Sequence, residues 1–290
     1  YLINLMITVY ISKLKGDVNT IDSPLVNTIK GCLAEIQNRG DISNETLDYF
    51  FVDNPRVGRF YLLPKIHKRL NSVPGRPVIS NCKYYTENIS SFLDFHLKPL
   101  AQSVKSYIKD STDFLKKLRS LPKIRKNCIL CTIDVVGLYP NIPHEEGLTA
   151  LKKTLEKQEF EAVSKETMVE LTDCVLKNNV FEHNNKQYRQ IQGTAIGTKM
   201  APQYAIIFMG YLEEAFLSQC SLKPLVWWRY IDDIFMIWEH GEENLKSFLN
   251  DLNNFHHTIK FTSDYSPEKI SFLDAQVILT YLLSLPIPIN

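Results

Sequence analysis

The sequence predicts an α+β fold whose core follows the order β-α-β-β-α-β. Two observations support this prediction: runs rich in β-branched and aromatic residues, and helical spacing of apolar residues between those runs. The core segments are, in order, a strand at 127–139, a helix at 200–216, a hairpin at 226–231 and 234–238, a helix at 242–255 and strands near 259–262 and 270–279. This order is that of a split ferredoxin-like unit.

Local signals predict the remaining elements. Residues 1–50 are loosely helical, with a helix start at Asp41–Glu45. Residues 56–85 mix Pro, Gly and basic residues with short strand-like runs, and residues 86–126 follow a helical pattern. The other expected elements are helices at 145–157 and 164–178 and a hairpin at 180–192 that turns at Asn184-Asn185.

The charge of the chain is unevenly distributed. The length of 290 residues fits about two domains or one large one, and 44% hydrophobic residues suffice for a substantial core. Residues 1–126 carry 20 Lys and Arg against 11 Asp and Glu, a net charge of +9, whereas residues 127–290 carry 13 against 21, a net charge of −8. A basic half suits phosphate backbones and an acidic half suits metal ions. The basic stretch 98–126 is either a nucleic-acid contact or a solvated helix, and its candidate contacts are Lys116, Lys117 and Lys123.

Several classes of protein do not fit the sequence. Six irregularly spaced cysteines indicate reduced intracellular thiols, and Cys128-x-x-Cys131 does not suit zinc because strand residues three apart point to opposite faces. No apolar run reaches the roughly 18 residues of a membrane span, so no membrane partner is expected. Residues 1–11 lack the basic flank and the cleavage site of a signal peptide. The expected location is intracellular, in the nucleus, with the cytoplasm as the alternative. The chain begins with Tyr1 rather than Met, which indicates a fragment.

Two adjacent carboxylates, Asp232 and Asp233, lie where the hairpin at 226–238 would turn. Most Asp-Asp pairs are solvated turns, so the pair alone is weak evidence of function. Its apolar flanks predict a largely buried hairpin, however, and buried carboxylates need an ion pair or a metal ion.

A third carboxylate, Asp134, lies near the end of the strand at 127–139, which Gly137 and Pro140 stop. By itself Asp134 would be a strand-end cap. Together with Asp232 and Asp233 it completes the set of carboxylates that phosphoryl transfer with two Mg²⁺ ions requires.

In these blocks the chain resembles reverse transcriptases. The Asp134-x-x-x-x-Tyr139 strand and Tyr230-Ile231-Asp232-Asp233 are similar to motifs A and C of that family. Further blocks follow in the right order: 62–68 and 74–80 resemble the basic fingers segments, 193–202 resembles motif B, and 259–262 and 270–274 resemble motifs D and E. The sequence motifs Leu-Pro-Lys-Ile-His-Lys, Gly-Thr-Ala-Ile-Gly-Thr and Phe-Leu-Asp are most similar to those of Penelope-like retroelements. The resemblance to the family covers about residues 55–275.

The resemblance implies a right-hand polymerase fold and an RNA-directed DNA polymerase that adds dNTPs to a primer 3′-hydroxyl. The implied partners are an RNA template, a DNA primer or nicked target DNA, and dNTPs, with two Mg²⁺ ions, or Mn²⁺, as cofactors. The implied regions are a helical N-terminal extension at 1–54, fingers at 55–126, a palm at 127–280 and a truncated or aberrant tail at 281–290 in place of a thumb. A packing of part of 145–192 with the fingers is an open alternative.

By resemblance, Asp134 and Asp232 bridge the two metal ions and Asp233 supports one of them. Lys65 and Arg76 lie in the fingers segments and are candidates for binding the triphosphate, Arg76 through its bidentate fork and Lys65 as a point charge. Without the motif context, both would be ordinary surface bases.

Tyr139 lies at the sugar-gate position of the family, where a ring clashes with a 2′-hydroxyl and favours dNTPs; the alternative is a core tyrosine at a strand end. Gly197 and Pro202 match motif B, in which a glycine lets the backbone approach the templating base pair. Gln192-Gly193 departs from the common pattern, because it lies four residues before the position of the usual Gln-Gly.

Phe272 and Leu273 are expected to form the primer grip, although core strand residues would have the same pattern. Either Lys260 or Lys269 would supply the lysine of motif D that protonates pyrophosphate.

Two alternatives to an active polymerase remain. One is a retroelement remnant that binds nucleic acid through its basic half without turnover. The other is an unrelated two-metal nuclease, which Tyr139 and the fingers segments disfavour because a nuclease needs neither.

Overall fold

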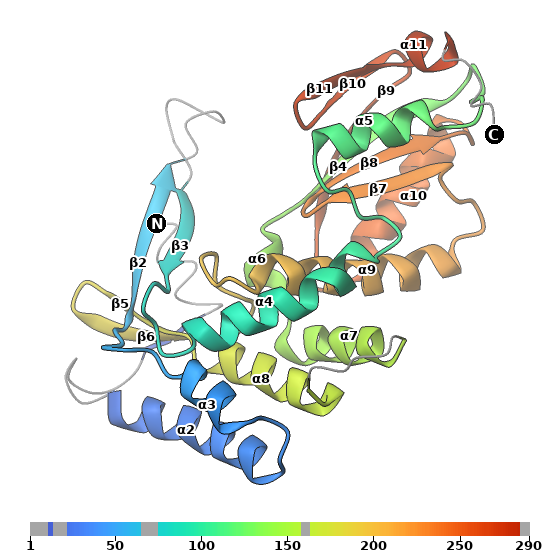
Figure 1. Cartoon of the computed structure of the whole chain (residues 1–290). Helices are drawn as coiled ribbons and strands as arrows, with labels where there is room; N and C mark the ends of the chain where they lie inside the picture. Colours follow the sequence, from blue (N-terminus) through green and yellow to red (C-terminus); the bar gives the residue numbers. More distant parts are fainter. Residues whose placement is uncertain (1–10, 14–21, 65–74, 158–162, 285–290) are drawn as a thin grey trace. The chain divides into compact units, whose positions relative to one another are not determined.

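The computed structural model describes residues 11–13, 22–64, 75–157 and 163–284, and the chain divides into two compact units (Figure 1). Unit 1 comprises residues 1–100 and 139–205, and unit 2 comprises residues 101–138 and 206–290. The fingers and palm boundaries expected from the sequence follow a different division and stay predictions. None of the described helices is long and apolar enough to cross a membrane.

Unit 2 is built on a four-stranded antiparallel sheet in the order β7-β8-β4-β9. Its strands are β4 (Ile129–Val135), β7 (Val226–Tyr230), β8 (Asp233–Trp238) and β9 (Phe261–Ser266). Helix α9 (Ala201–Gln219) precedes β7, and helix α10 (Glu242–Phe255) precedes β9. The order β-α-β-β-α-β predicted from the sequence is therefore confirmed.

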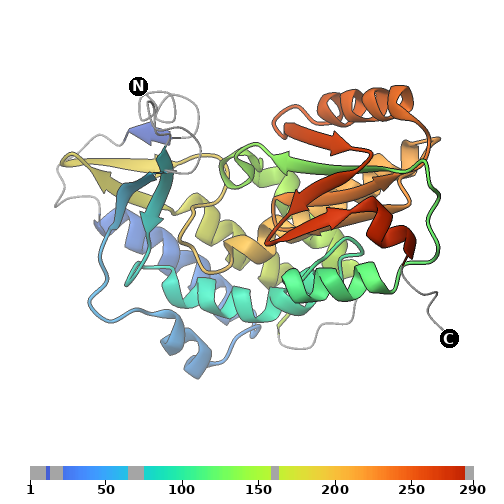
Figure 2. The same cartoon turned by 90° about the horizontal axis from the view of Figure 1, so that it is seen from above.

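Both faces of this sheet are covered, and Figure 2 shows α10 and α5 on opposite sides of it. One face contacts α9, as in the ion pair between Arg229 and Glu213. The other face packs against α5 (Ser111–Arg119) and against the hairpin formed by β10 (Lys269–Phe272) and β11 (Ala275–Ile278). The rings of Phe114, Phe235 and Phe272 meet there, with centroids at most 5.5 Å apart. This cluster holds the sheet to α5 and the hairpin.

Unit 1 contains a five-stranded sheet in the order β1-β6-β5-β2-β3. Its strands are β1 (Ile11–Lys13), β2 (Gly58–Pro64), β3 (Gly75–Ser80), β5 (Val180–His183) and β6 (Lys186–Gln190). Its helices are α2 (Asp22–Asn38), α3 (Asn44–Phe50), α4 (Glu87–Gln102) up to residue 100, α6 (Leu138–Asn141) from residue 139, α7 (His144–Glu156), α8 (Lys165–Lys177) and the first turn of α9. Strands β2 and β3 pair in antiparallel fashion, as the strand-like runs in 56–85 predict.

Two predictions from local sequence, a hairpin turn and a helix start, are confirmed by the structure. Asn184 and Asn185 have φ values of +50° and +55°, which is the backbone of the two-residue hairpin turn predicted there. Helix α3 begins as predicted, because the hydroxyl of Ser43 accepts a hydrogen bond from the Thr46 N–H at 3.2 Å.

Two N-terminal predictions differ from the structure. Residues Ile11–Lys13 form a strand in a region predicted to be helical, because they pair with β6 and form the edge of the sheet. Residues 86–126, which follow a helical pattern in the sequence, contain two separate helices, α4 and α5. Between them, Ser106 and Ile108 form backbone hydrogen bonds with Arg229 in β7, and this pairing interrupts the helix.

The segment 270–279, predicted as one strand, is the hairpin of β10 and β11. Its turn at Leu273-Asp274 is held by the Ser111 hydroxyl, which donates to the Asp274 carboxylate at 2.7 Å. A short helix, α11 (Leu279–Ser284), follows.

Candidate active site

The three carboxylates predicted to bind metal lie together in unit 2. Asp134, near the end of β4, is paired directly with Asp233, the first residue of β8. Opposed residues of an antiparallel pair point to the same face, with Cβ atoms about 4.5–5.5 Å apart. Asp232 precedes them in the turn from β7 to β8, and its carbonyl accepts a hydrogen bond from the Val135 N–H at 3.0 Å. The register of β4 and β8 thus gathers all three at one end of the sheet.

These carboxylates are half-buried, whereas the next five residues of β8, from Ile234 to Trp238, are buried. Like charges directly opposite each other on paired strands destabilise a sheet. A divalent cation between Asp134 and Asp233 would turn this repulsion into attraction. The hard oxygen ligands therefore fit Mg²⁺ or Mn²⁺.

The turn that carries Asp232 has an unusual backbone. Ile231 has a φ of +53°, in the left-handed region that β-branched residues rarely adopt. Such strain costs on the order of 1–3 kcal/mol and persists only where surrounding contacts impose it. A hydrogen bond of 3.0 Å from the Arg229 guanidinium to the Ile231 carbonyl is one such contact.

No function was predicted from the sequence for Arg229, Glu213 or Ser106, which form a buried network on the opposite face of the sheet. One signal was present. An arginine inside the apolar strand 226–231 and a glutamate inside the apolar helix 200–216 each need a partner when buried.

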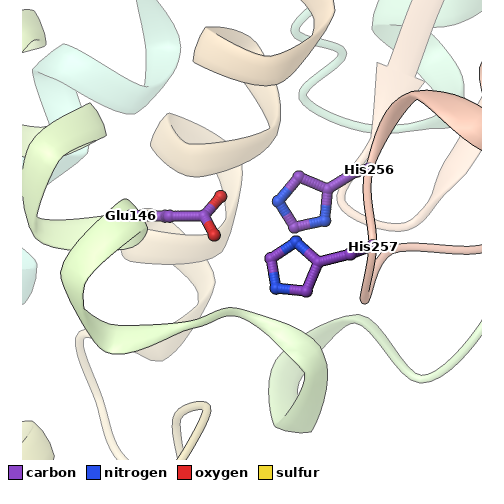
Figure 3. Close-up of side chains that lie close together, drawn as sticks. All are labelled: Glu146, His256 and His257. Carbon is purple, nitrogen blue, oxygen red and sulfur yellow. The ribbon is translucent and has the colours of Figure 1, made fainter.

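The cysteines and histidines of unit 2 are held in structural contacts. Burial raises the pKa of Cys131 to about 12 and that of Cys128 to about 11, so both thiols stay protonated near neutral pH. The imidazoles of His256 and His257 stack with centroids 4.7 Å apart (Figure 3). His256 Nδ1 accepts the N–H groups of Thr258 and Ile259, each at 3.2 Å, and so shapes the turn into β9.

Tyr139, the predicted sugar gate, is half-buried in unit 1, and its backbone is held by the segment that resembles motif B. The Tyr139 carbonyl accepts the Thr194 N–H at 2.9 Å, and the Ile142 carbonyl accepts the Gly193 N–H at 3.0 Å. Gly193 has a φ of +73°, and a Cβ there would lie 2.5 Å from Pro140 Cα. Only glycine fits this close approach, which gives Gly193 a structural role despite its departure from the family pattern.

Replacing Gly193 with Ala is expected to destabilise the protein by more than the left-handed backbone alone would. The added Cβ meets the backbone of Pro140, which cannot rotate away. Gly40→Ala is the matched control, because Gly40 has a φ of +79° with nothing within 4 Å of its Cβ position. Urea unfolding measures both variants, and the control should lose about 1–2 kcal/mol. Equal losses would contradict the proposed clash.

Gly197 and Pro202 both have clear backbone roles in unit 1. Gly197 has a φ of +123°, and a Cβ there would lie 2.2 Å from the carbonyl oxygen of Ile79 in β3. The Ile79 N–H donates to the Ile196 carbonyl at 3.0 Å, so the loop is joined to β3. Pro202 lies in the first turn of α9, where its missing N–H costs nothing.

Arg76 is exposed on β3, opposite Leu63 of β2, and Lys65 lies outside the described residues. A cavity of about 220 Å³ opens beside the base of this hairpin. It is lined by the polar side chains of Ser80, Asn81, Thr86, Glu87, Ser90, Thr198 and Lys199, together with Tyr61, Val78, Cys82 and Gly197.

The three lysines of unit 2 that were predicted to contact nucleic acid differ in their surroundings. Lys116 and Lys123 are exposed. Lys117 instead donates to the Tyr107 carbonyl, with its ammonium 3.8 Å from Asp113. The predicted phosphate contact at Lys117 would therefore compete with bonds inside the protein.

Unit 2 also contains three residues that were predicted to serve in the primer grip or in motif D. Phe272 is 3% exposed, as the alternative of a core strand residue requires, whereas Leu273 is half-buried at the turn with a φ of +51°. Lys260 donates to the carbonyls of Asn253 and His256 at 2.8 and 2.9 Å, which caps the end of α10.

A family model described as "Reverse transcriptase (RNA-dependent DNA polymerase)" matches residues 66–282. Apo telomerase of Candida tropicalis, truncated from its C-terminal domain, is similar with a TM-score of 0.61 and 11% identity over 99% of this chain and 58% of that one. Telomerase of Candida albicans in complex with a TWJ fragment of telomeric RNA gives a TM-score of 0.60 and 11% identity over 96% and 52%. An RNA-dependent RNA polymerase of BmCPV gives 0.52 and 13% over 93% and 28%.

The chain spans little more than half the length of these two telomerase chains. At these identities the likeness shows the fold alone, and it confirms the α+β polymerase fold predicted from the sequence. No curated protein matches the chain.

Proposed function

Because the chain belongs to the reverse transcriptase (RNA-dependent DNA polymerase) family, we propose that it copies an RNA template by adding dNTPs to a primer 3′-hydroxyl. The observation that carries this proposal is the direct opposition of Asp134 and Asp233, with Asp232 in the adjoining turn. Phosphoryl transfer depends mainly on positioning and electrostatic stabilisation, and these carboxylates supply the anionic site that it needs.

Asp134, Asp232 and Asp233 are the proposed ligands of two divalent ions, Mg²⁺ or Mn²⁺. Such ions would activate the primer hydroxyl and neutralise charge on the transferring phosphate. The protein holds its ligands with little freedom, because two are on paired strands and the third follows a turn bonded to β4. This preorganisation lowers the cost of assembling the site.

Arg76 is the proposed triphosphate contact in unit 1, and Lys65, which lies outside the described residues, is a second candidate from the sequence alone. The guanidinium of Arg76 is exposed and can bind two phosphate oxygens at once. Gly197 and the cavity beside it support the further proposal that residues 197–199 face the templating base pair. Tyr139 is the proposed gate against ribonucleotides.

The finer assignment is to a Penelope-like retroelement. It is supported by the residue sequences of two segments, Leu62–His67 and Gly193–Thr198. Residues 62–64 of the first segment end strand β2, and the second segment is hydrogen-bonded to Tyr139. The corresponding primer would be DNA, including nicked target DNA, and the location would be nuclear.

Primer extension tests the proposed function. The purified chain, a DNA primer on an RNA template, Mg²⁺ and dNTPs should give products longer than the primer. Replacing dNTPs by rNTPs separates a DNA polymerase from an RNA polymerase, which matters because RNA polymerases share the fold. Tight binding of the primer–template without extension, in either Mg²⁺ or Mn²⁺, would instead favour a remnant that only binds nucleic acid.

Arg76→Ala is expected to raise the KM for dNTP much more than the Kd for the primer–template. A triphosphate clamp touches the nucleotide, not the duplex, and losing a bidentate contact to a charged group costs about 1.5–3 kcal/mol. Arg59→Ala is the matched control, since it removes the same charge from the other strand of the hairpin. Steady-state kinetics and duplex titrations measure both effects.

Replacing Lys116 and Lys123 together with Ala should have the opposite effect. Each lost phosphate contact is expected to reduce the slope of log K against log salt by about one while leaving the KM for dNTP unchanged. Lys117 is left intact because its ammonium bonds within the protein. If the Arg76 variant and this double variant behaved alike, the assignment of separate nucleotide and duplex contacts would fail.

A further inference from the structure

Arg229 carries a charge in the interior of unit 2. Its side chain is 0% exposed, and it lies on β7 three residues before Asp232. It faces away from the carboxylates, because it is paired with Ile234 on the face of the sheet that contacts α9. An arginine in this position needs a complete set of partners.

The guanidinium of Arg229 has that set. Its Nε donates to Glu213 Oε1 at 2.7 Å and its Nη2 to Glu213 Oε2 at 3.3 Å. Glu213 is braced in turn by the Ser106 hydroxyl, at 2.5 Å from Oε2. Nη2 also donates to the Ile206 carbonyl at 3.1 Å, and Nη1 donates to the Ile231 carbonyl at 3.0 Å. The guanidinium therefore joins α9 to the acidic turn.

The backbone of Arg229 is fixed as firmly as its side chain. Its N–H donates to the Ser106 carbonyl at 2.6 Å, and its carbonyl accepts the Ile108 N–H at 2.9 Å. With both ends of the residue held, the guanidinium has little freedom to follow a moving turn. The guanidinium is therefore a fixed hydrogen-bond donor, and the Ile231 carbonyl of the turn is oriented toward it.

The bond to Ile231 falls at the strained position of the turn. The carbonyl of Ile231 belongs to the peptide that leads into Asp232, and Ile231 itself has a φ of +53°. A strained backbone persists where its surroundings over-determine it, and a change of this peptide would reorient Asp232.

We propose that Arg229 is a positioning residue that, braced by Glu213 and Ser106, holds the Ile231–Asp232 peptide in the orientation in which Asp232 can bind metal together with Asp134 and Asp233. The inference rests on the proposed function. The contribution of Arg229 is to the geometry of the site rather than to the stability of the fold, because a buried ion pair can often be replaced by apolar residues without loss of stability.

The decisive variant is the double substitution Arg229→Met with Glu213→Leu. It removes the buried charges together, so no unpaired charge remains, and it deletes the donor to Ile231. We expect a melting temperature close to that of the unmodified chain, together with at least about a tenfold weaker affinity of the protein for Mn²⁺, read by calorimetry in the absence of nucleotide. The kcat for primer extension should fall by a similar factor at unchanged duplex Kd.

Arg229→Lys provides a second route if the double variant does not fold. Lysine keeps the charge beside Glu213, but its single ammonium lacks the fork that reaches Glu213 and Ile231 together. Leu252→Ala is the control for lost stability alone, because Leu252 is a buried apolar residue of α10 and is neither a proposed metal ligand nor a member of the Arg229 network. At a temperature where it is folded, this control should bind Mn²⁺ normally.

The Mn²⁺ titration separates the inference from the proposed function. If the unmodified chain binds Mn²⁺ through Asp134 but does not extend primers, the proposed function fails while the effect of Arg229 on the metal site is still measured. A folded Arg229 variant with normal Mn²⁺ affinity and normal kcat overturns the inference.

Discussion

Asp134→Asn is expected to lower the rate of nucleotide addition by several orders of magnitude while leaving the fold and duplex binding nearly intact. Asparagine keeps the shape of the side chain but loses one anionic metal ligand. Stabilisation of transition-state charge by a metal ion is worth several kcal/mol, and each 1.4 kcal/mol is about tenfold in rate. Asp232→Asn should behave in the same way.

The position of Asp134 opposite Asp233 adds a second expectation. Without bound metal, the two carboxylates repel each other across the strand pair, so Asp134→Asn should leave the melting temperature unchanged or slightly raised. A residue that merely supports the fold would lose stability and activity together. Thermal unfolding in a chelator and single-turnover extension in Mg²⁺ measure the two quantities.

Asp264→Asn is the matched control for Asp134→Asn. Asp264 is an exposed carboxylate on β9 and is paired with Thr132 of β4. Thr132 lies two residues before Asp134 in the same strand, so Asp264 is on the same face of the sheet as Asp134. The Asp264→Asn substitution removes the same charge from the same sheet as Asp134→Asn does, but primer extension should continue at nearly the rate of the unmodified chain. The metal-site assignment would be wrong if Asp134→Asn also extended primers at that rate.

Tyr139→Val is expected to raise the use of ribonucleotides relative to deoxynucleotides by about ten- to a hundredfold, the range that one steric contact in a pocket provides. A ring beside the sugar penalises the 2′-hydroxyl by collision, so removing it should admit rNTPs more than it harms dNTPs. The measurement is the ratio of kcat/KM for dGTP and rGTP on one RNA template.

Tyr139→Phe is the matched control, because it keeps the ring and loses only the hydroxyl, and its ratio should not change. The backbone bonds from Thr194 to Tyr139 and from Gly193 to Ile142 do not involve the side chain, so the loop should survive both substitutions. A parallel fall in both activities with Tyr139→Val would identify a core tyrosine and remove the gate assignment.

Predictions that depend on short-range chemistry came from the sequence alone. Two asparagines adopt positive φ more readily than other residues, so the turn at 184–185 was readable without knowledge of its surroundings. Ser43 begins α3 through a bond to a residue three positions away. The apolar runs around Asp134 and Asp232 identified the strands β4, β7 and β8 in the same way, from composition within a few residues.

The same local reasoning failed where a distant partner decided the outcome. The helical pattern at 86–126 is interrupted because Ser106 and Ile108 bond to Arg229, which is more than 120 residues later in the chain. Lys117 was proposed as a phosphate contact from its charge alone, and the structure adds that its ammonium donates to the Tyr107 carbonyl. The composition of a segment shows which side chains are present. It does not show which backbone groups of other segments will form hydrogen bonds with them.

The sequence by itself determined the candidate ligands, the strands that carry them and, through motif order, the family. Only the tertiary structure decided that Asp134 is opposed to Asp233, that Gly193 fixes the loop of Tyr139, and that Arg229 reaches the Ile231 carbonyl. The physical reason is range. Turn, strand and cap preferences arise between near neighbours, whereas strand register and the pairing of buried charges depend on contacts between different elements, whose geometry is set by the packed fold as a whole.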